Sequence, residues 1–571
     1  MAHFHVKKKN GRPYLYVREI ARVDGKPKVV SQTYIGTPEK VAELAKQAKA
    51  PNLSVKLKVE QFGALWLALQ IEDQIDLAGL IDSIVPSAAQ EKGPSIGEYF
   101  LAAMLNRMVS PASKNALADW FKTTAIQLLR PMDIDALNSQ RYWEKWDRVS
   151  EEQLSEIAKQ LFQRIIELEP TDAEGVLFDT TNYYTFMSGS TDSKLAKRGN
   201  NKAGRHNLRQ IGVSLLVDKA KRLPLWYRLY PGNMHDSKLF GEVMDEMFGA
   251  VCGLTSAKQL TVVIDKGMNS EDNFAHIDDQ EHLHFLTTYS TYFEQELAST
   301  PLDKFQILNT PKNQQLVEDG KEKDQISAFR ATGEYWGKLR RVIVTHNPKT
   351  ARKKEYVLAS KLDTLRSQLA EMQGKVNSNA PQWRAEDKIR KRFDECCRKL
   401  HIPSDLYELK FTRTTDGKLN MWYNRNTRRI NAYRASFGRN IIITDHMDWT
   451  SEAIVDFSQQ RWKVEDQFRN SKSEQMVGMQ PIYHWTDSKI RCHVFTCIAA
   501  MAYLRLIELR LQRSKVKMTA KKAMKDMAEL HSVMTILNKK PARVLEQPTK
   551  TQVKILKAFG HKISNGVLQA L

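Results

Sequence analysis

The chain has 571 residues, of which 42% are hydrophobic and 27% are charged; this balance is typical of folded proteins and excludes a largely disordered chain. Its 87 Lys and Arg outnumber 66 Asp and Glu, and the net charge of +21 favours a polyanionic partner such as nucleic acid over a merely basic protein. Five cysteines without a CxxC pair argue against a disulfide framework and a zinc site. Because we find neither an apolar signal core nor an uninterrupted apolar run of membrane length, we expect a cytoplasmic protein that, if bacterial, reaches the nucleoid directly.

Residues 1–50 alternate in the manner of short strands. Three runs, FHVKKK, PYLYVREIARV and KVVSQTYIG, are separated by the turn signals Asn10-Gly11 and Asp24-Gly25. We expect a small antiparallel sheet with basic edges. This sheet either contacts DNA or caps its neighbour, and the residues favour neither alternative.

Residues 51–170 have helical periodicity. The run IGEYFLAAMLNRMV follows a Pro-Ser helix start and ends at a Ser-Pro pair. Further helices are expected over about 114–130, 137–147 and 151–168. We predict a helical domain here, and it is a candidate for binding DNA ends.

Strand-like apolar runs begin at Gly175. The run VLFD ends in an acid at Asp179, and QIGVSLLVD and LPLWYRL follow as two more strands. After the turn PGNMHDS and a helix, the run LTVVID ends in a second acid at Asp265, and a short helix and the strand LHFLT come next. This order of elements predicts a mixed α/β sheet.

Residues 291–444 are more charged and less regular. Strand-like pieces (RRVIVTH, LNMWYNR and NIIITDH) flank a polar helical segment near 350–400, which we expect to form a solvent-facing hairpin. The basic cluster within 338–354 either contacts DNA or is a solvated surface. Residues 494–511 form an apolar helix that we expect to be buried against the sheet, and residues 513–571 read as a basic helical tail.

The stretch from Phe457 to Gln475, FSQQRWKVEDQFRNSKSEQ, reads as one amphipathic helix without Pro or Gly. Arg461, Glu465 and Lys472 stand at i, i+4 and i+11, and these offsets return to within about 40° of each other on a helix. A carboxylate between two cations suits a site that handles a metal ion and a phosphate chain. Taken alone, the stretch fits a solvated helix with an ordinary Glu–Arg ion pair equally well.

Three carboxylates together change that balance: Asp179 and Asp265 at strand ends, and Glu465 on the helix. Mg²⁺ prefers oxygen ligands and keeps open positions for water and phosphate oxygens. Two such ions about 4 Å apart activate a water and stabilise the leaving oxygen of an in-line phosphoryl displacement. A lone Asp at a strand end is usually a cap, but two of them with a basic-flanked Glu predict a metal-dependent site in a polycationic chain.

These residues resemble those of the bacterial insertion-sequence DDE transposases, in the subgroup with a Tyr-x2-Arg-x3-Glu-x6-Lys signature. Arg461, Glu465 and Lys472 have the spacing of that signature, whereas Ser458 stands at its Tyr position, so the phosphate contact of the Tyr is not carried over. The run FDTT resembles the first-Asp strand and IDKGM the second-Asp motif. RQIG, YPGN and the following HDS resemble the strands and turn between them, and the likeness covers residues 175–510.

The resemblance implies an α/β fold with an RNase H-like mixed-sheet catalytic core, formed by residues 171–290 and 445–512. An inserted β-rich plus helical domain, residues 291–444, interrupts this core. The expected architecture is completed by the N-terminal β domain 1–50, the helical bundle 51–170 and a helical C-terminal region 513–571.

The implied reaction is metal-dependent cleavage at insertion-sequence ends, followed by attack of the freed 3′-hydroxyl on target DNA. Asp179, Asp265 and Glu465 are then the catalytic residues and the ligands of two Mg²⁺ ions, with Mn²⁺ as a substitute, and Arg461 and Lys472 bind DNA phosphates. The implied partners are double-stranded DNA, as terminal inverted repeats and target, and a second copy of the chain in a synaptic homodimer.

Two other hypotheses stay open from the sequence. One is a non-catalytic DNA-binding protein descended from a transposase, and the presence of all three carboxylates counts against it. The other is an RNase H-fold nuclease that acts alone, and the extra N-terminal domain and basic tail count against it.

Overall fold

A nine-stranded mixed sheet lies at the centre of the computed structural model, in the order β10-β11-β12-β15-β9-β8-β5-β6-β7. The structure describes residues 2–9, 12–23, 26–47, 55–87, 90–171, 174–200, 204–255, 259–537 and 540–571. The predicted turns Asn10-Gly11 and Asp24-Gly25 lie outside these residues. The large mixed sheet with many helices confirms the predicted α/β class.

One half of the sheet contains β5, which carries Asp179, and β8, which ends just before Asp265. Its strands are β5 (Gly175–Thr185), β6 (Arg209–Asp218), β7 (Pro224–Pro231), β8 (Leu260–Ile264) and β9 (Leu283–Tyr289). β5, β6 and β7 pair in antiparallel fashion, whereas β8 is parallel to both β5 and β9. α9 (Asp236–Leu254) and α10 (Glu271–Asp278) connect β7 to β8 and β8 to β9. Every residue of β8 is buried, as expected for a central strand in which Thr261 stands among four apolar residues.

The other half of the sheet comes from the region expected to form a separate inserted domain. β10 (Gln306–Ile307), β11 (Ser327–Tyr335), β12 (Lys338–His346) and β15 (Arg439–Thr444) continue the same sheet, and β15 pairs with β9. The structure therefore differs from the predicted boundary at residues 291 and 444. β12 and β15 pair with each other, and β15 pairs with the edge of β9, so their apolar residues are buried within the main sheet.

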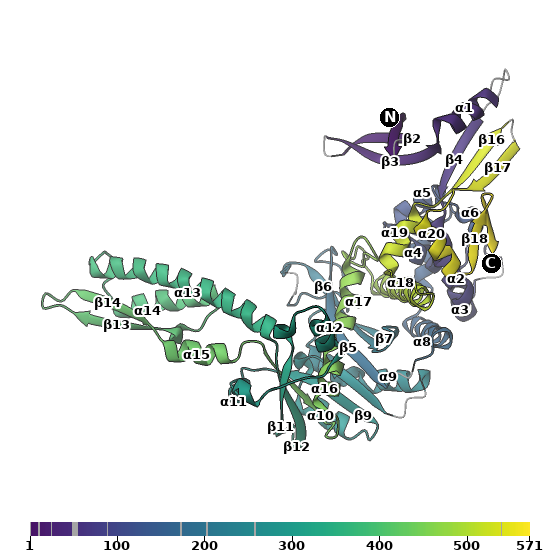
Figure 1. Cartoon of the computed structure of the whole chain (residues 1–571). Coiled ribbons are helices and arrows are strands. Elements are labelled where there is room, and N and C mark those ends of the chain that lie inside the picture. Colours follow the sequence, from purple (N-terminus) through teal and green to yellow (C-terminus); the bar gives the residue numbers. More distant parts are fainter. Residues whose placement is uncertain are drawn as a thin grey trace.

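Residues 348–438 of that region project far from the body, and we call them the arm (Figure 1). The arm consists of α13 (Pro348–Asn377), α14 (Glu386–Leu400), β13 (Tyr407–Arg413), β14 (Leu419–Arg425) and α15 (Thr427–Ala435). Its apolar side chains form a hydrophobic cluster of their own, separate from the main core. The predicted polar helical hairpin near 350–400 is present as α13 and α14.

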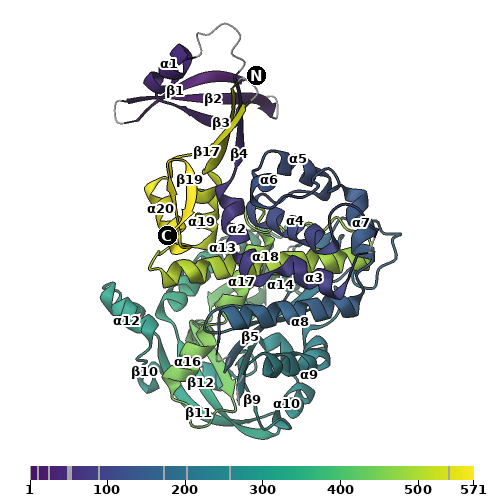
Figure 2. The ribbon, with the colours of Figure 1, turned by 90° about the vertical axis from the view of Figure 1, so that its right-hand side faces the viewer.

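The helical part of the chain and one long C-terminal helix share the main core. Its larger helices are α2 (Gly63–Ile75), α3 (Leu77–Ile84), α4 (Ile96–Val109), α7 (Ser139–Asp147) and α8 (Glu151–Leu168). The predicted start of α4 is a capping box between Ser95 and Glu98. α18 (Asp487–Arg513) runs across this layer and contacts α2, α4, α7 and α8 (Figure 2). α18 is long and apolar enough to cross a membrane, but 89% of its most apolar window is buried inside the protein, which is the environment of a core helix.

The two ends of the chain contain more β structure than the sequence predicts. β1 (Ala2–Lys9), β2 (Arg12–Val23) and β3 (Lys26–Gly36) form the expected antiparallel sheet, followed by α1 (Pro38–Gln47). The predicted helical tail is wrong in part. Besides α19 (Ala520–Ala528) and α20 (Lys550–Ala558), it contains the strands β16 (His531–Leu537), β17 (Lys540–Leu545), β18 (His561–Ser564) and β19 (Val567–Ala570). β16 lies between β17 and β4 (Val55–Gln61), a strand inside the region predicted to be helical.

Candidate active site

The predicted single helix over 457–475 is divided into two helices by a tight turn. α16 (Ser451–Gln459) ends and α17 (Trp462–Lys472) begins around Arg461. At this turn the backbone N–H groups of Gln460 and Arg461 donate to carbonyls three residues earlier, on Phe457 and Ser458. The continuous-helix prediction is therefore wrong, although Arg461 still precedes Glu465 by one turn.

The two aspartates stand side by side on neighbouring parallel strands. Asp265 directly follows the end of β8, as predicted, whereas Asp179 lies inside β5, so the prediction that Asp179 ends a strand is wrong. β5 and β8 pair with Leu177 opposite Val263, so two residues further along each strand the register places Asp179 opposite Asp265. The Asp179 carboxylate accepts a hydrogen bond from the Thr180 N–H at 2.8 Å. Asp265 caps a short 3₁₀ helix and accepts from the Lys266 N–H at 2.8 Å. Both carboxylates are thus held at one edge of the sheet by their own backbone.

Arg461 joins these aspartates to the predicted glutamate. Its Nη1 lies 2.5 Å from Asp265 Oδ1, and its Nη2 lies 2.8 Å from Glu465 Oε1. Burial lowers the pKa of Arg461, but the charges of Asp265 and Asp179 outweigh burial and raise it. The Glu465 side chain is 52% exposed and that of Asp265 is 36% exposed, so the carboxylates are open to solvent and ligands. Three carboxylates therefore surround one guanidinium at an accessible edge of the sheet.

Lys472 lies further along β5. Its Nζ donates to Thr181 Oγ1 at 2.7 Å and lies 5.2 Å from the centre of the Tyr183 ring. Residues 179, 181 and 183 alternate onto the same face of the strand. The Tyr183 hydroxyl also contacts Ser471 Oγ at 2.6 Å, which fixes the end of α17 against β5. Lys472 is thus a cation on the face of β5 that carries Asp179.

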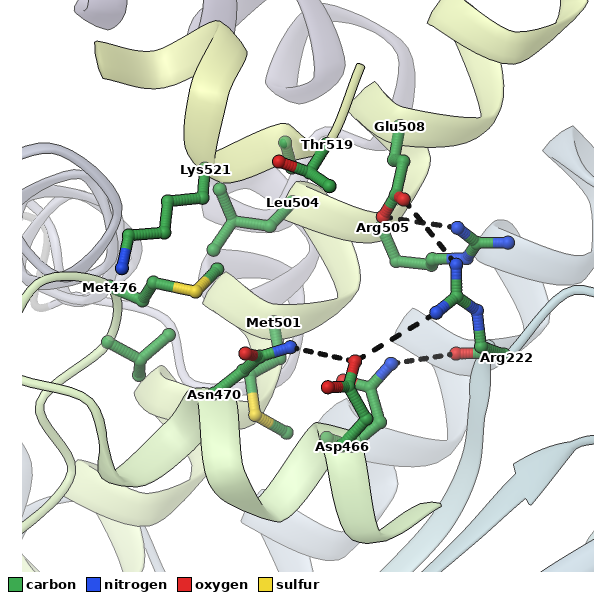
Figure 3. A pocket seen from close by; sticks show the side chains of 13 residues that line it. Arg222, Asp466, Asn470, Met476, Met501, Leu504, Arg505, Glu508, Thr519 and Lys521 are labelled. Atoms are coloured by element: carbon green, nitrogen blue, oxygen red, sulfur yellow. Dashed lines mark hydrogen bonds and ion pairs between the residues drawn. The ribbon is translucent and has the colours of Figure 1, made fainter. Parts of the chain in front are cut away.

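A network of ion pairs anchors the other side of α17. Figure 3 shows Asp466 between Asn470 and Arg222, with Asn470 Nδ2 3.1 Å and Arg222 Nη1 3.9 Å away from the Asp466 carboxylate. Arg222 also contacts Glu508 on α18 at 3.4 Å. Neighbouring residues on a helix point about 100° apart, so this network fixes α17 without involving Glu465.

Tyr230 and Asp236 belong to the site's support, and sequence reasoning assigned them no role. The buried Tyr230 hydroxyl is hydrogen-bonded to the side chains of Thr180 and Asp236, and its pKa is raised by burial and by the Asp236 charge. The Tyr230 ring occupies the space beside Gly212, where a Cβ atom would lie only 2.1 Å from it. The YPGN and HDS motifs could have indicated the pair of Tyr230 and Asp236, because a buried Tyr needs a hydrogen-bond partner for its hydroxyl.

The donor set fits divalent cations. Asp179, Asp265 and Glu465 offer only carboxylate oxygens, the ligand type that Mg²⁺ and Mn²⁺ prefer. The Arg461 guanidinium acts as a cationic stand-in among them. A metal ion that binds there has to compete with Arg461.

A second group of metal-binding residue types lies at the other end of β8 and does not fit an ion. His284, Asp445 and His446 have ligand atoms within 4.8 Å of one another. The two imidazole rings, however, are 4.4 Å apart with only 32° between their planes. Their nitrogen lone pairs lie in those planes and so do not converge on one point. His446 contacts Thr261, near the start of β8, so the group takes no part in the carboxylate site.

Among curated proteins, none matches the sequence. Matches among solved structures include a piggyBac transposase synaptic complex with hairpin DNA, at 8% identity over 81% of this chain and 78% of that chain, with a TM-score of 0.37. They also include a Mos1 transposase paired-end complex with the left transposon end, at 11% identity over 41% of this chain and 74% of that chain, with a TM-score of 0.15. Both TM-scores are below 0.5, and we draw nothing from either likeness.

The family comparison is more extensive. Residues 171–504 match the family model described as transposase DDE domain. The matched segment spans well over half of the chain and contains Asp179, Asp265, Arg461, Glu465 and Lys472. The chain therefore belongs to the transposase DDE domain family.

Proposed function

We propose that this protein is a cut-and-paste transposase, which cleaves DNA at the ends of an insertion sequence and joins the freed ends to target DNA. The observation that supports this proposal best is the meeting of Asp179, Asp265 and Glu465 around one cation, Arg461. These residues come from strand β5, the end of strand β8 and helix α17, which lie far apart in the sequence. The net charge of +21 is what a chain that handles long DNA needs.

In this proposal Asp179, Asp265 and Glu465 are the catalytic residues and hold two Mg²⁺ ions, with Mn²⁺ as a substitute. When bound, such ions activate a water and stabilise the leaving oxygen of a phosphodiester. Arg461 neutralises the carboxylates before metal and DNA arrive, and its N–H groups then pair with phosphate oxygens. Lys472, held by Thr181, contacts a phosphate further along β5.

The proposed partners follow from the reaction. The chain acts on double-stranded DNA, first at terminal inverted repeats and then at the target. Two ends have to be brought together, so we infer a homodimer in the synaptic complex, and we place the protein in the bacterial cytoplasm at the nucleoid. The helical part, residues 51–170, is the proposed reader of DNA ends.

The test is cleavage of DNA that carries the two ends flanking the gene. Wild-type protein with Mg²⁺ is expected to nick at the terminal phosphates, and EDTA is expected to abolish nicking. Asp179→Asn is expected to bind the same DNA without nicking it. Nicking that survives in Asp179→Asn would refute the site assignment, and tight binding without nicking by the wild type would favour a non-catalytic DNA-binding protein.

Arg461 gives a prediction for metal binding without DNA. Arg461→Gln leaves Asp265 and Glu465 facing each other without their counter-charge, so we expect a lower melting temperature in EDTA. Mg²⁺ should then raise the melting temperature of this variant more than that of the wild type, because the ion no longer competes with a guanidinium. Differential scanning fluorimetry over a Mg²⁺ series measures both effects. An equal Mg²⁺ response in the two proteins would show that Arg461 does not occupy the metal position.

A further inference from the structure

A second cationic site lies in a cavity between the helical part of the chain and the loop that follows α17. The cavity has a volume of about 710 Å³, within the size range of ligand pockets. Arg107 at the end of α4 and Lys114 in the 3₁₀ helix Lys114–Ala116 line one side. His484 in the loop and His493 on α18 line the other side.

The Lys114 ammonium is buried without an anionic partner. The residue is 6% exposed, and its Nζ has no hydrogen-bond partner among the described residues. The contacts that it makes are with ring faces, 5.5 Å from the centre of Tyr142 and 5.0 Å from that of Trp146. Burial of an unpaired ammonium is costly, and burial together with the charge of Arg107 lowers the pKa of Lys114 well below its usual range. An anion in the cavity would remove this cost.

The other basic groups in the cavity add to its positive character. Arg107 is largely buried; its guanidinium donates to the carbonyls of Gly478 and Ala112, and its Nε has no partner. Burial and the charges of Lys114 and Arg107 lower the pKa of His484 to about 3, so this imidazole stays neutral. The acid among the lining residues, Glu474, is exposed. The lining of the cavity therefore combines two largely buried basic side chains, Lys114 and Arg107, with a neutral imidazole.

The mouth of the cavity is aromatic. Trp143, Tyr483 and Trp485 line it with side chains that are 38%, 65% and 48% exposed. Exposed rings of this kind are stacking surfaces for bases, and each stacked base contributes independently of its sequence. A lining that combines a buried lysine with exposed aromatic rings offers partners for both parts of one nucleotide, its phosphate and its base.

We propose that this cavity binds a nucleotide of a DNA strand, with the phosphate at Lys114 and Arg107 and the base on the aromatic mouth. The proposal rests on the proposed DNA-handling function and adds a second contact to it, away from the carboxylates. The loop 473–486 that lines the cavity directly follows α17, so a strand held here is tied to the helix that carries Glu465.

The test measures binding of a fluorescent dT10 oligonucleotide by anisotropy in EDTA, without metal or transposon ends. Lys114→Met keeps the aliphatic stem, and we expect about 10-fold weaker binding or more, with a salt dependence reduced by about one ion. Lys122→Met is the matched control. Lys122 lies in the same region, is exposed, and pairs with Asp119 and Asp135. Its affinity should change less than about 3-fold. Trp485→Ala should weaken binding about 5-fold or more.

Two further measurements define the ligand. Phosphate at 10 mM should raise the melting temperature of the wild type and not that of Lys114→Met. A 5′-phosphate on the oligonucleotide should strengthen wild-type binding if the site holds a strand end. It should leave binding unchanged if the site holds an internal phosphodiester. Weaker oligonucleotide binding by Lys114→Met supports the proposal in both cases. Unchanged binding by Lys114→Met, an equal loss in Lys122→Met, or stabilisation by phosphate without oligonucleotide binding overturns it. None of these binding measurements requires cleavage of transposon ends, so their results are independent of the nicking test of the proposed function.

Discussion

Glu465→Gln is expected to lower the rate of nicking at transposon ends by about 10³-fold or more, which corresponds to about 4 kcal/mol of transition-state stabilisation. The amide keeps the size of the side chain but loses the negative charge that holds a divalent ion. Glu465 is half exposed and its protein partner is Arg461, so the fold should lose little stability. Single-turnover nicking with Mg²⁺, together with a DNA-binding titration, measures the two parts separately.

The neighbouring residue gives the matched control. Asp466→Asn removes a carboxylate one position away, where it pairs with Arg222 and accepts from Asn470 on the anchored side of α17. This variant should lose thermal stability and keep most of its nicking rate at a temperature where it stays folded. If both variants lost the same activity, the effect of Glu465 would come from the position of α17 and not from a ligand role.

Glu72→Ala is expected to lower the free energy of unfolding by about 3–5 kcal/mol. Glu72 is fully buried on α2 and accepts hydrogen bonds from the backbone N–H groups of Leu77 and Ala78 at the start of α3. It also accepts from the Tyr503 hydroxyl on α18 at 2.6 Å. Its removal leaves these three buried donors without a partner.

Urea unfolding followed by circular dichroism measures this loss. Asp73→Ala is the control, because Asp73 is the adjacent acid, is exposed, and accepts a long hydrogen bond of 3.4 Å from the Gln70 side chain. Its effect should be within about 0.5 kcal/mol. Equal effects of the two substitutions would show that the link between α3 and α18 does not depend on the Glu72 carboxylate.

The strands near the two aspartates could be predicted because each contains an apolar run that is followed by an acid. Asp179 and Asp265 follow such runs, and a parallel pairing of buried strands is what their composition favours. The Arg-Glu-Lys spacing indicated which helix brings the third carboxylate. The break at Arg461 was missed because no Pro or Gly marks it; hydrogen bonding at the turn, and not residue type, ends α16.

The extent of the sheet could not be predicted. β12 and β15 contain the short apolar runs VIV and III, which predict buried strands but name no partner. Their pairing depends on which edge is free after β9 is in place. The run HSVMTIL has the β-branched residues of a strand, but the lysines around it favoured a helical tail. Its partner β4 is about 470 residues away, a separation at which local pattern carries no information.

The arm begins and ends at one point of the body, where the Asn347 N–H donates to the Gly438 carbonyl at 2.9 Å. Gly438 has φ +72°, and a Cβ there would lie 2.5 Å from the Asn347 carbonyl, so this closure needs glycine. β12 and β15, the strands on either side, are already paired neighbours, so a short hairpin loop could join them in place of the arm without disturbing the sheet. Evolution can therefore lengthen, shorten or replace the arm as a unit, and the chain can acquire a new reach along DNA while the carboxylate site stays as it is.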